Sequence, residues 1–188
     1  YKLLSQVKPD AMLVLGDTNS CLSVIPAKRL HIPIFHMEAG NRCFDECLPE
    51  ETNRRIVDII SDVNMCYSEH ARRYLNASGV AKERTYVTGS PMAEVLHQNL
   101  AEIEASDVHA RLGLEKGKYI LLSAHREENI DTEKNFKSLF TAINAMAEKY
   151  DMPILYSCHP RSRKRLEQSG FKLDGRVIQH EPLGFHDY

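Results

Sequence analysis

The chain has 188 residues, of which 43% are hydrophobic and 27% charged. These proportions are typical of globular proteins and exclude a disordered, collagen-like or low-complexity chain. With 24 Lys and Arg against 26 Asp and Glu, the formal net charge of −2 provides no overall field to attract nucleic acid, so we expect no nucleic-acid partner.

The five cysteines form an odd set without CxxC spacing, which favours reduced thiols and excludes the usual pattern of a structural zinc site. No apolar run reaches the roughly 20 residues of a membrane helix, and the start does not resemble a signal peptide. We therefore expect a cytoplasmic protein without membrane insertion. The chain begins at Tyr1 rather than Met and stops at Tyr188 inside an expected turn, so we expect a sequence truncated at both ends.

Seven short, mostly apolar runs bounded by turn residues predict β-strands. In chain order they span residues 11–15, 32–37, 63–67, 84–88, 119–124, 154–158 and 177–180.

Helices are predicted between these strands. Residues 50–61 follow Pro49 and carry two acids in the first turn, with Ile56, Ile59 and Ile60 as the expected apolar stripe. Residues 132–150 repeat apolar side chains every three or four positions after a capping residue, Asp131. Two shorter helices are expected at residues 69–77 and 161–168, each before a glycine.

Strands and helices alternate along the chain, which predicts an α/β fold with parallel, doubly wound sheets. The pattern weakens into a polar helical stretch between residues 97 and 112. We therefore predict a first domain at residues 1–96, a linking region at 97–118 and a second domain at 119–188.

Polar side chains gather where the predicted strands end, at the edge where open parallel sheets bind ligands. Each alone is explained as well by helix capping or an ordinary hydrogen bond. Together they favour a site, because charges held away from water are costly unless they are paired or used. The set comprises Asp17, His36, Glu38, His125, Arg126, His159 and Arg161, joined by Glu50 and Glu51 at the start of a helix.

Several carboxylates and a histidine without metal-ligand spacing suit general acid–base chemistry, with a divalent ion as the lower-ranked alternative. Arg42, Arg54, Arg55 and Arg126 lie beside these acids and could bind phosphate, although ordinary ion pairs explain Arg55 equally well. The absence of GxGxxG and Walker patterns argues against a nicotinamide cofactor or ATP. Cys43 and Cys47 lack the surroundings of a nucleophilic thiol.

The chain resembles the non-hydrolysing UDP-N-acetylglucosamine 2-epimerases in four ordered motifs. These are Leu15-Gly16-Asp17-Thr18, His36-Met37-Glu38-Ala39-Gly40, Pro49-Glu50-Glu51-Thr52-Asn53-Arg54 and His125-Arg126-Glu127. The resemblance implies two Rossmann-like halves of a B-type glycosyltransferase-like fold and epimerisation at carbon 2 of a UDP-linked 2-acetamido sugar. It also implies elimination and readdition of UDP, no external cofactor, no metal and a homodimer.

On the same resemblance, Asp17, Glu38 and Glu50 match the family's acid–base carboxylates, and His125 matches its histidine near the departing diphosphate. Arg54 and His159 match positions near the cleft or a regulatory nucleotide site. With Arg42 and Arg126 they form the predicted substrate-binding set. Residues 41–46 and 126–131 look more like the branch that makes UDP-N-acetyl-L-fucosamine for capsule or O-antigen; UDP-N-acetylglucosamine is the rival substrate.

Three other functions remain open: a hydrolysing 2-epimerase, a glycosyltransferase of similar fold, and a nucleotide-sugar binding module. The family's first strands and later uridine-binding loops are missing from this sequence, so we expect the 188 residues alone to be weakly active or inactive.

Overall fold

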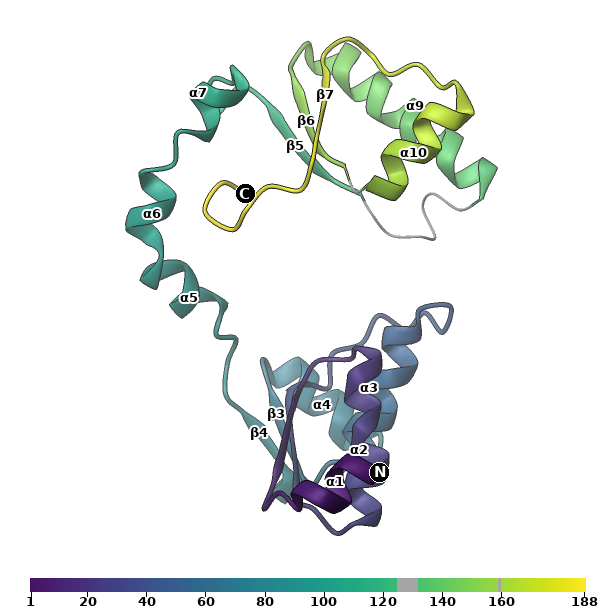
Figure 1. Cartoon of the computed structure of the whole chain (residues 1–188), viewed down its shortest axis with the longest axis vertical. Coiled ribbons are helices and arrows are strands. Elements are labelled where there is room, and N and C mark those ends of the chain that lie inside the picture. The colour runs from purple at the N-terminus through teal and green to yellow at the C-terminus, as the bar shows by residue number, and fades with distance from the viewer. Residues whose placement is uncertain (125–131, 159) are drawn as a thin grey trace. The chain divides into compact units, whose positions relative to one another are not determined.

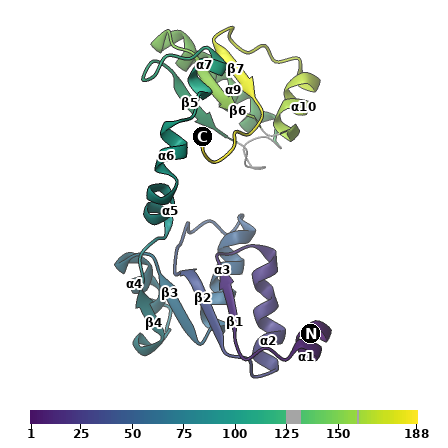
Figure 2. The same cartoon turned by 60° about the vertical axis from the view of Figure 1, so that its left-hand side comes forward.

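The computed structural model describes residues 1–124, 132–158 and 160–188, and divides the chain into unit 1, Tyr1–Val95, and unit 2, Leu96–Tyr188. Each unit has its own parallel sheet (Figures 1 and 2). The boundary falls inside the helix α5 (Met92–Gln98), one residue from the predicted end of the first domain.

Unit 1 is built on four parallel strands whose order in the sheet follows the chain: β1 (Met12–Leu15), β2 (Ile34–Ala39), β3 (Val63–Cys66) and β4 (Thr85–Val87). The connecting helices include α2 (Val24–Arg29), α3 (Pro49–Ile60) and α4 (Glu69–Ala77). The unit also contains α1 (Lys2–Val7) and two 3₁₀ helices, η1 (Asn19–Ser23) and η2 (Lys82–Arg84).

Among its described residues, unit 2 has three parallel strands, again in chain order: β5 (Ile120–Ser123), β6 (Ile154–Ser157) and β7 (Val177–His180). The long helix α9 (Glu133–Tyr150) joins β5 to β6, and α10 (Pro160–Ser169) joins β6 to β7. Two short helices, α6 (Leu100–Glu104) and α7 (Val108–Leu112), precede the sheet. All seven predicted strands are confirmed to within two residues at each end.

The core of unit 1 lies between the sheet and its helices. Val24 and Ala27 of α2 and Val57 of α3 pack on Ile34 of β2. Leu75 of α4 packs with Ala39 of β2 and Cys66 of β3. Each strand is added on the same side of the previous one, so right-handed crossovers place α2, α3 and α4 on one face (Figure 1). A doubly wound sheet, as expected from the sequence, carries helices on both faces. In the described residues of unit 1, these three helices cover only one face.

The opposite face of this sheet is apolar and open. Leu13 and Leu15 are 64% and 57% exposed, and Phe35 of the neighbouring strand is 36% exposed. Leu13 and Leu15 alternate with half-buried residues of β1, and Phe35 lies between two buried residues of β2, as the period of a β-strand requires.

The core of unit 2 is aromatic. Phe136 and Phe140 of α9, Tyr156 of β6 and Phe171 after α10 form a cluster of rings with centroids 4.6–6.3 Å apart. The apolar stripe predicted for α9 is confirmed, but the helix is capped by Thr132, whose hydroxyl accepts a hydrogen bond from Asn135 N at 3.2 Å. The cap predicted at Asp131 is therefore placed one residue too early, and Asp131 itself lies outside the described residues.

Candidate active site

Two of the predicted carboxylates come from neighbouring strand ends. Strands β1 and β2 pair in parallel with Val14 opposite His36 and Leu15 opposite Met37. Asp17 lies two residues after Leu15 and Glu38 one residue after Met37, so the register brings both residues to the same edge of the sheet. This edge is the candidate active site of unit 1.

Arg54 joins these two carboxylates. Its Nη2 lies 2.5 Å from Asp17 Oδ2 and 3.5 Å from Glu38 Oε1, and its Nη1 donates to the main-chain oxygen of Glu38. The Arg54 side chain is only 8% exposed, whereas those of Asp17 and Glu38 are 24% and 32% exposed. One buried guanidinium therefore compensates two charges that remain open to a ligand.

The neighbouring Asn53 fixes the turn after β1. Its side-chain amide donates to the main-chain oxygen of Asp17 at 3.0 Å and to Asn19 Oδ1 at 2.9 Å. Residues 53 and 54 thus attach helix α3 to both strand ends.

Glu38 has an unusual backbone. Its φ of 63° lies in the left-handed region, and the pairing of β2 with β3 is irregular between Met37 and Ala39. Such conformations cost a side-chain-bearing residue about 1–3 kcal/mol and occur preferentially at functional sites. The Glu38 carboxylate lies beside Gly16, the residue after β1, and Asn41 Nδ2 donates to its Oε1 at 3.4 Å.

Arg42, predicted to bind phosphate, faces the interior instead. Its side chain is 4% exposed, and Nη1 donates to Asp58 Oδ2 at 2.7 Å and to the main-chain oxygen of Asn41 at 2.8 Å. Arg54 is committed to Asp17 and Glu38 in the same way. Both arginines therefore hold the site together, and neither presents an unpaired guanidinium to a ligand in this structure.

The two acids at the start of α3 have different surroundings. Glu50 is exposed, whereas the Glu51 side chain is 2% exposed and accepts hydrogen bonds from Cys43 N at 3.0 Å and Arg55 Nε at 2.7 Å. Burial raises the pKa of Glu51, but the hydrogen bonds from Cys43 and Arg55 outweigh it and leave the pKa below 4.5. Glu51 thus ties the loop after Glu38 to α3, and Glu50 is left free for a ligand.

Sequence reasoning missed Tyr67, which directly follows β3, the neighbour of β2. Burial and then the negative charge of Glu38 raise the pKa of the Tyr67 phenol, so it stays protonated and can donate a hydrogen bond. Because Tyr67 follows a strand end, as Asp17 does, the rule used for the carboxylates could have identified it from the sequence.

Three predicted site residues, His125, Arg126 and His159, lie outside the described residues. Among the described residues, no group of three or more His, Cys, Asp or Glu is placed to hold a metal ion. No helix in the described part of the chain is long and apolar enough to cross a membrane.

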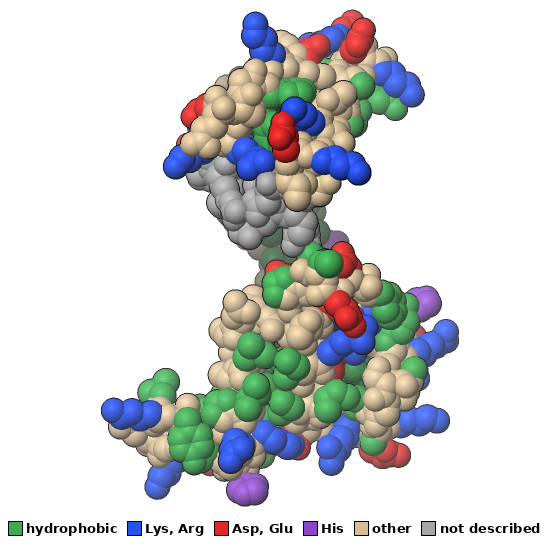
Figure 3. Space-filling model, turned by 90° about the vertical axis from the view of Figure 1, so that its right-hand side faces the viewer, with side chains coloured by type: hydrophobic (Ala, Val, Ile, Leu, Met, Phe, Trp, Pro, Cys, Tyr) green, Lys and Arg blue, Asp and Glu red, His purple; other side chains and the backbone are tan. Residues whose placement is uncertain are grey.

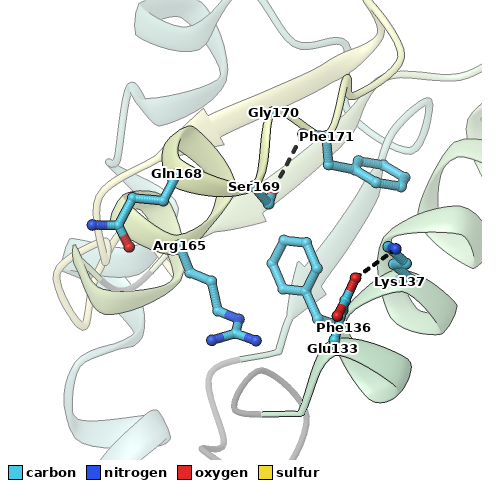
Figure 4. Close-up of a pocket in the computed structure, with 8 residues that line it drawn as sticks. All are labelled: Glu133, Phe136, Lys137, Arg165, Gln168, Ser169, Gly170 and Phe171. Atoms are coloured by element: carbon cyan, nitrogen blue, oxygen red, sulfur yellow. Dashed lines mark hydrogen bonds and ion pairs between the residues drawn. The ribbon is translucent and has the colours of Figure 1, made fainter.

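A surface hollow of about 370 Å³ lies elsewhere, between α9, α10 and the turn after α10 (Figure 4). The guanidinium carbon of Arg165 lies 5.3 Å from the centroid of the Phe136 ring, and Lys137 forms an ion pair with Glu133; all four residues line the hollow. None of the predicted site residues that the structure describes lines this hollow. On the face of the molecule in Figure 3, basic and acidic side chains are interspersed rather than gathered by sign.

These features define a class of protein: a parallel α/β chain whose first sheet presents two arginine-linked carboxylates at adjacent strand ends. The family model for UDP-N-acetylglucosamine 2-epimerase matches residues 1–188. The chain belongs to this family.

Solved structures agree with this assignment. The UDP-N-acetylglucosamine 2-epimerase from Rickettsia bellii is 46% identical, with a TM-score of 0.89 over 100% of this chain and 50% of that one. The Methanocaldococcus jannaschii enzyme in complex with UDP-GlcNAc and UDP is 34% identical, with a TM-score of 0.88 over 99% of this chain and 53% of that one. The B-type glycosyltransferase-like fold expected from the sequence is confirmed.

A relative with a different substrate in its name is also similar. The UDP-2,3-diacetamido-2,3-dideoxy-D-glucuronate 2-epimerase of Pseudomonas aeruginosa is 34% identical over 95% of this chain and 49% of its own length. The chain thus spans about half the length of the relatives it matches.

Proposed function

We propose that the whole protein epimerises carbon 2 of a UDP-linked 2-acetamido sugar by eliminating and readding UDP. The observation that carries the proposal is the Arg54 bridge, which holds Asp17 and Glu38 together at the strand ends. Inversion requires that a proton leave one face of the sugar ring and return to the other. Two carboxylates placed side by side suit this division of acid and base.

The proposed reaction runs through a bound glycal. A carboxylate removes the proton from carbon 2, the electron pair forms the double bond between carbons 1 and 2, and the bond from carbon 1 to the UDP oxygen breaks. Protonation of carbon 2 from the opposite face and readdition of UDP at carbon 1 give the epimer. Asp17, Glu38 and Glu50 are the proposed acid–base groups, and the proposal needs no external cofactor.

The other predicted residues complete this proposal. Loss of UDP needs compensation of charge developing on the diphosphate, a role that the motif resemblance gives to His125 with Arg126. His159 stays a proposed substrate contact. Arg42 and Arg54 act in the proposal by supporting the carboxylate edge, since both are paired with protein oxygens.

The substrate is a UDP-activated amino sugar in this proposal, and the product serves polysaccharide synthesis such as capsule or O-antigen. The names of the relatives include both UDP-N-acetylglucosamine and a diacetamido glucuronate substrate. UDP-2-acetamido-2,6-dideoxy-L-talose, the precursor of the L-fucosamine branch, is the third sugar to compare. We propose a homodimer in the cytoplasm as the working assembly.

The test is incubation of the whole protein with each UDP-sugar in heavy water, followed by NMR of carbon 2. Deuterium at carbon 2 with UDP-sugar as the product supports the proposal and identifies the substrate. Release of free 2-acetamido sugar and UDP would instead identify a hydrolysing epimerase. Binding of UDP without exchange with any of the three sugars would sink the proposal in favour of a binding module or a glycosyltransferase.

A further inference from the structure

We propose that Asp58 is a positioning residue for Glu38. Its buried carboxylate binds Gly40 N after Glu38 and contacts the His36 ring before it, and so holds this stretch in the conformation that presents the Glu38 side chain beside Asp17. The inference rests on the proposed function for its kinetic consequence, but the positioning itself concerns the protein alone.

The Asp58 side chain is fully buried on the sheet-facing side of α3. Its Oδ1 accepts a hydrogen bond from Gly40 N at 3.1 Å, and its Oδ2 accepts one from Arg42 Nη1 at 2.7 Å. The same Oδ1 lies 3.0 Å from Nδ1 of His36, a close contact without the alignment of a hydrogen bond. One carboxylate therefore contacts residues two before, two after and four after Glu38.

His36 extends this contact to the other strand end. Its ring is fully buried, and Nε2 lies 2.9 Å from the main-chain oxygen of Gly16, directly before Asp17. On the other side, Asn64 of β3 donates from Nδ2 to the main-chain oxygen of Asp58 at 3.0 Å. Asp58 thus connects β1, β2, β3 and α3 beneath the carboxylate edge.

The main chain around Glu38 needs such support. Glu38 itself has a left-handed φ of 63°, at a break in the β2–β3 pairing. The following Gly40 has φ 78°, and a Cβ added there would lie 2.4 Å from the main-chain oxygen of Ala71. A strained residue persists only where its surroundings over-determine the conformation, and the Asp58 contacts to Gly40 and Arg42 supply that constraint.

A purely stabilising role explains Asp58 less well. A buried ion pair is often matched or exceeded in stability by apolar side chains of similar volume. The three contacts of this carboxylate converge on one short stretch, residues 36–42, rather than on the core at large. The placement therefore indicates a role in fixing the geometry of that stretch.

The chain offers a control for this idea at the opposite end of β2. Asp62 accepts a hydrogen bond from Ile34 N at 3.0 Å and pairs with Lys28. Like Asp58, Asp62 accepts a hydrogen bond from a main-chain N–H and pairs with a cation, but it binds the start of β2, away from Glu38. Its side chain is 35% exposed, so its loss is tolerated more easily.

The experiment compares wild type, Asp58→Asn and Asp62→Asn in the whole protein. Asp58→Asn keeps the shape of the side chain but removes its charge. We expect kcat for exchange at carbon 2 to fall by about 100-fold, as for a misplacement of a reacting group by about 1 Å, with KM unchanged because ligand contacts remain. Asp62→Asn should keep both constants. A crystal structure of Asp58→Asn should show Glu38 displaced from its left-handed φ.

An Asp58→Asn protein that folds, retains wild-type kcat and keeps Glu38 in place would overturn the proposal. So would an equal loss of kcat in Asp62→Asn, since that would indicate general destabilisation. If Asp58→Asn does not fold, Asp58→Glu decides: it keeps the charge but moves the carboxylate relative to Gly40 N and Arg42 Nη1, so kcat should fall, and an unchanged kcat would count against the proposal. If wild type itself shows no exchange, the proposed function fails, and the position of Glu38 in the variant structure still decides the role of Asp58.

Discussion

The carboxylate of Glu38 lies directly against Gly16, so that a Cβ added to Gly16 would be 3.1 Å from Glu38 Oε2. Gly16 also has a φ of 75°, which favours glycine. The absence of a side chain at Gly16 therefore leaves room for the Glu38 carboxylate beside Asp17.

Gly16→Ala is therefore expected to displace the Glu38 carboxylate. We predict a loss of kcat of about 100-fold and a lower free energy of unfolding by about 1–2 kcal/mol from the left-handed backbone. The control is Gly79→Ala, where φ is 88° but nothing lies within 4 Å of the added Cβ. It should lose similar stability in urea unfolding and keep its kcat. Equal kinetic losses in the two variants would show that backbone strain alone is responsible.

Arg54→Met should separate the paired carboxylates from their only close cation among the described residues. Without this buried cation, the two neighbouring carboxylates, 24% and 32% exposed, would repel each other. We predict a strongly reduced rate of exchange at carbon 2 and a lower melting temperature. Arg55→Met, one residue later, removes a guanidinium that is 46% exposed. A kinetic defect in Arg55→Met as large as that in Arg54→Met would contradict the bridging role.

Glu50→Gln and Glu51→Gln should separate chemistry from support. Glu50 is exposed and free for a ligand, whereas Glu51 is occupied by Cys43 and Arg55. We expect Glu50→Gln to lose exchange activity by about 100-fold or more, the scale of general acid–base catalysis, with wild-type stability. Glu51→Gln should lower the free energy of unfolding more than it lowers the rate of exchange. The opposite pattern in kinetics and urea unfolding would assign the chemical role to Glu51.

Glu51 also predicts a dependence of stability on acid. Because its pKa in the folded protein lies below the value of 4.5 expected when unfolded, it contributes stability above about pH 4.5, and this contribution disappears as the pH falls through the folded pKa. The free energy of unfolding of wild type should therefore decrease more steeply below pH 4.5 than that of Glu51→Gln. Parallel pH curves would show that Glu51 is not held as an ionised group.

The strands and the carboxylate edge could be predicted from the sequence because both depend on local patterns. Apolar runs between turn residues marked the strands, and parallel pairing then placed Asp17 and Glu38 at one edge. The support beneath them could not be found in that way. Asp58 and Arg42 are sixteen residues apart and meet only because α3 folds back over β2.

The apolar stripe expected on α3 is confirmed only in part. Ile60 packs against the core of unit 1, but Ile59 is 59% exposed, and the helix also buries Arg54 and Asp58. The difference has a physical cause: paired charges at the site take places on the sheet-facing side that apolar side chains were expected to fill. A signal was present, since Glu51, Arg54 and Asp58 recur at three- and four-residue spacing on one side of the helix.

The left-handed backbone of Glu38 has a consequence for the protein's evolution. Glycine at this position would relieve the strain, and the side chain lost would be one that is 32% exposed and 3.5 Å from its cation. Selection for thermal stability alone would therefore favour replacement of Glu38 by glycine, and only selection for the reaction would retain the glutamate. A laboratory population evolved without its substrate should lose this glutamate before it loses the fold.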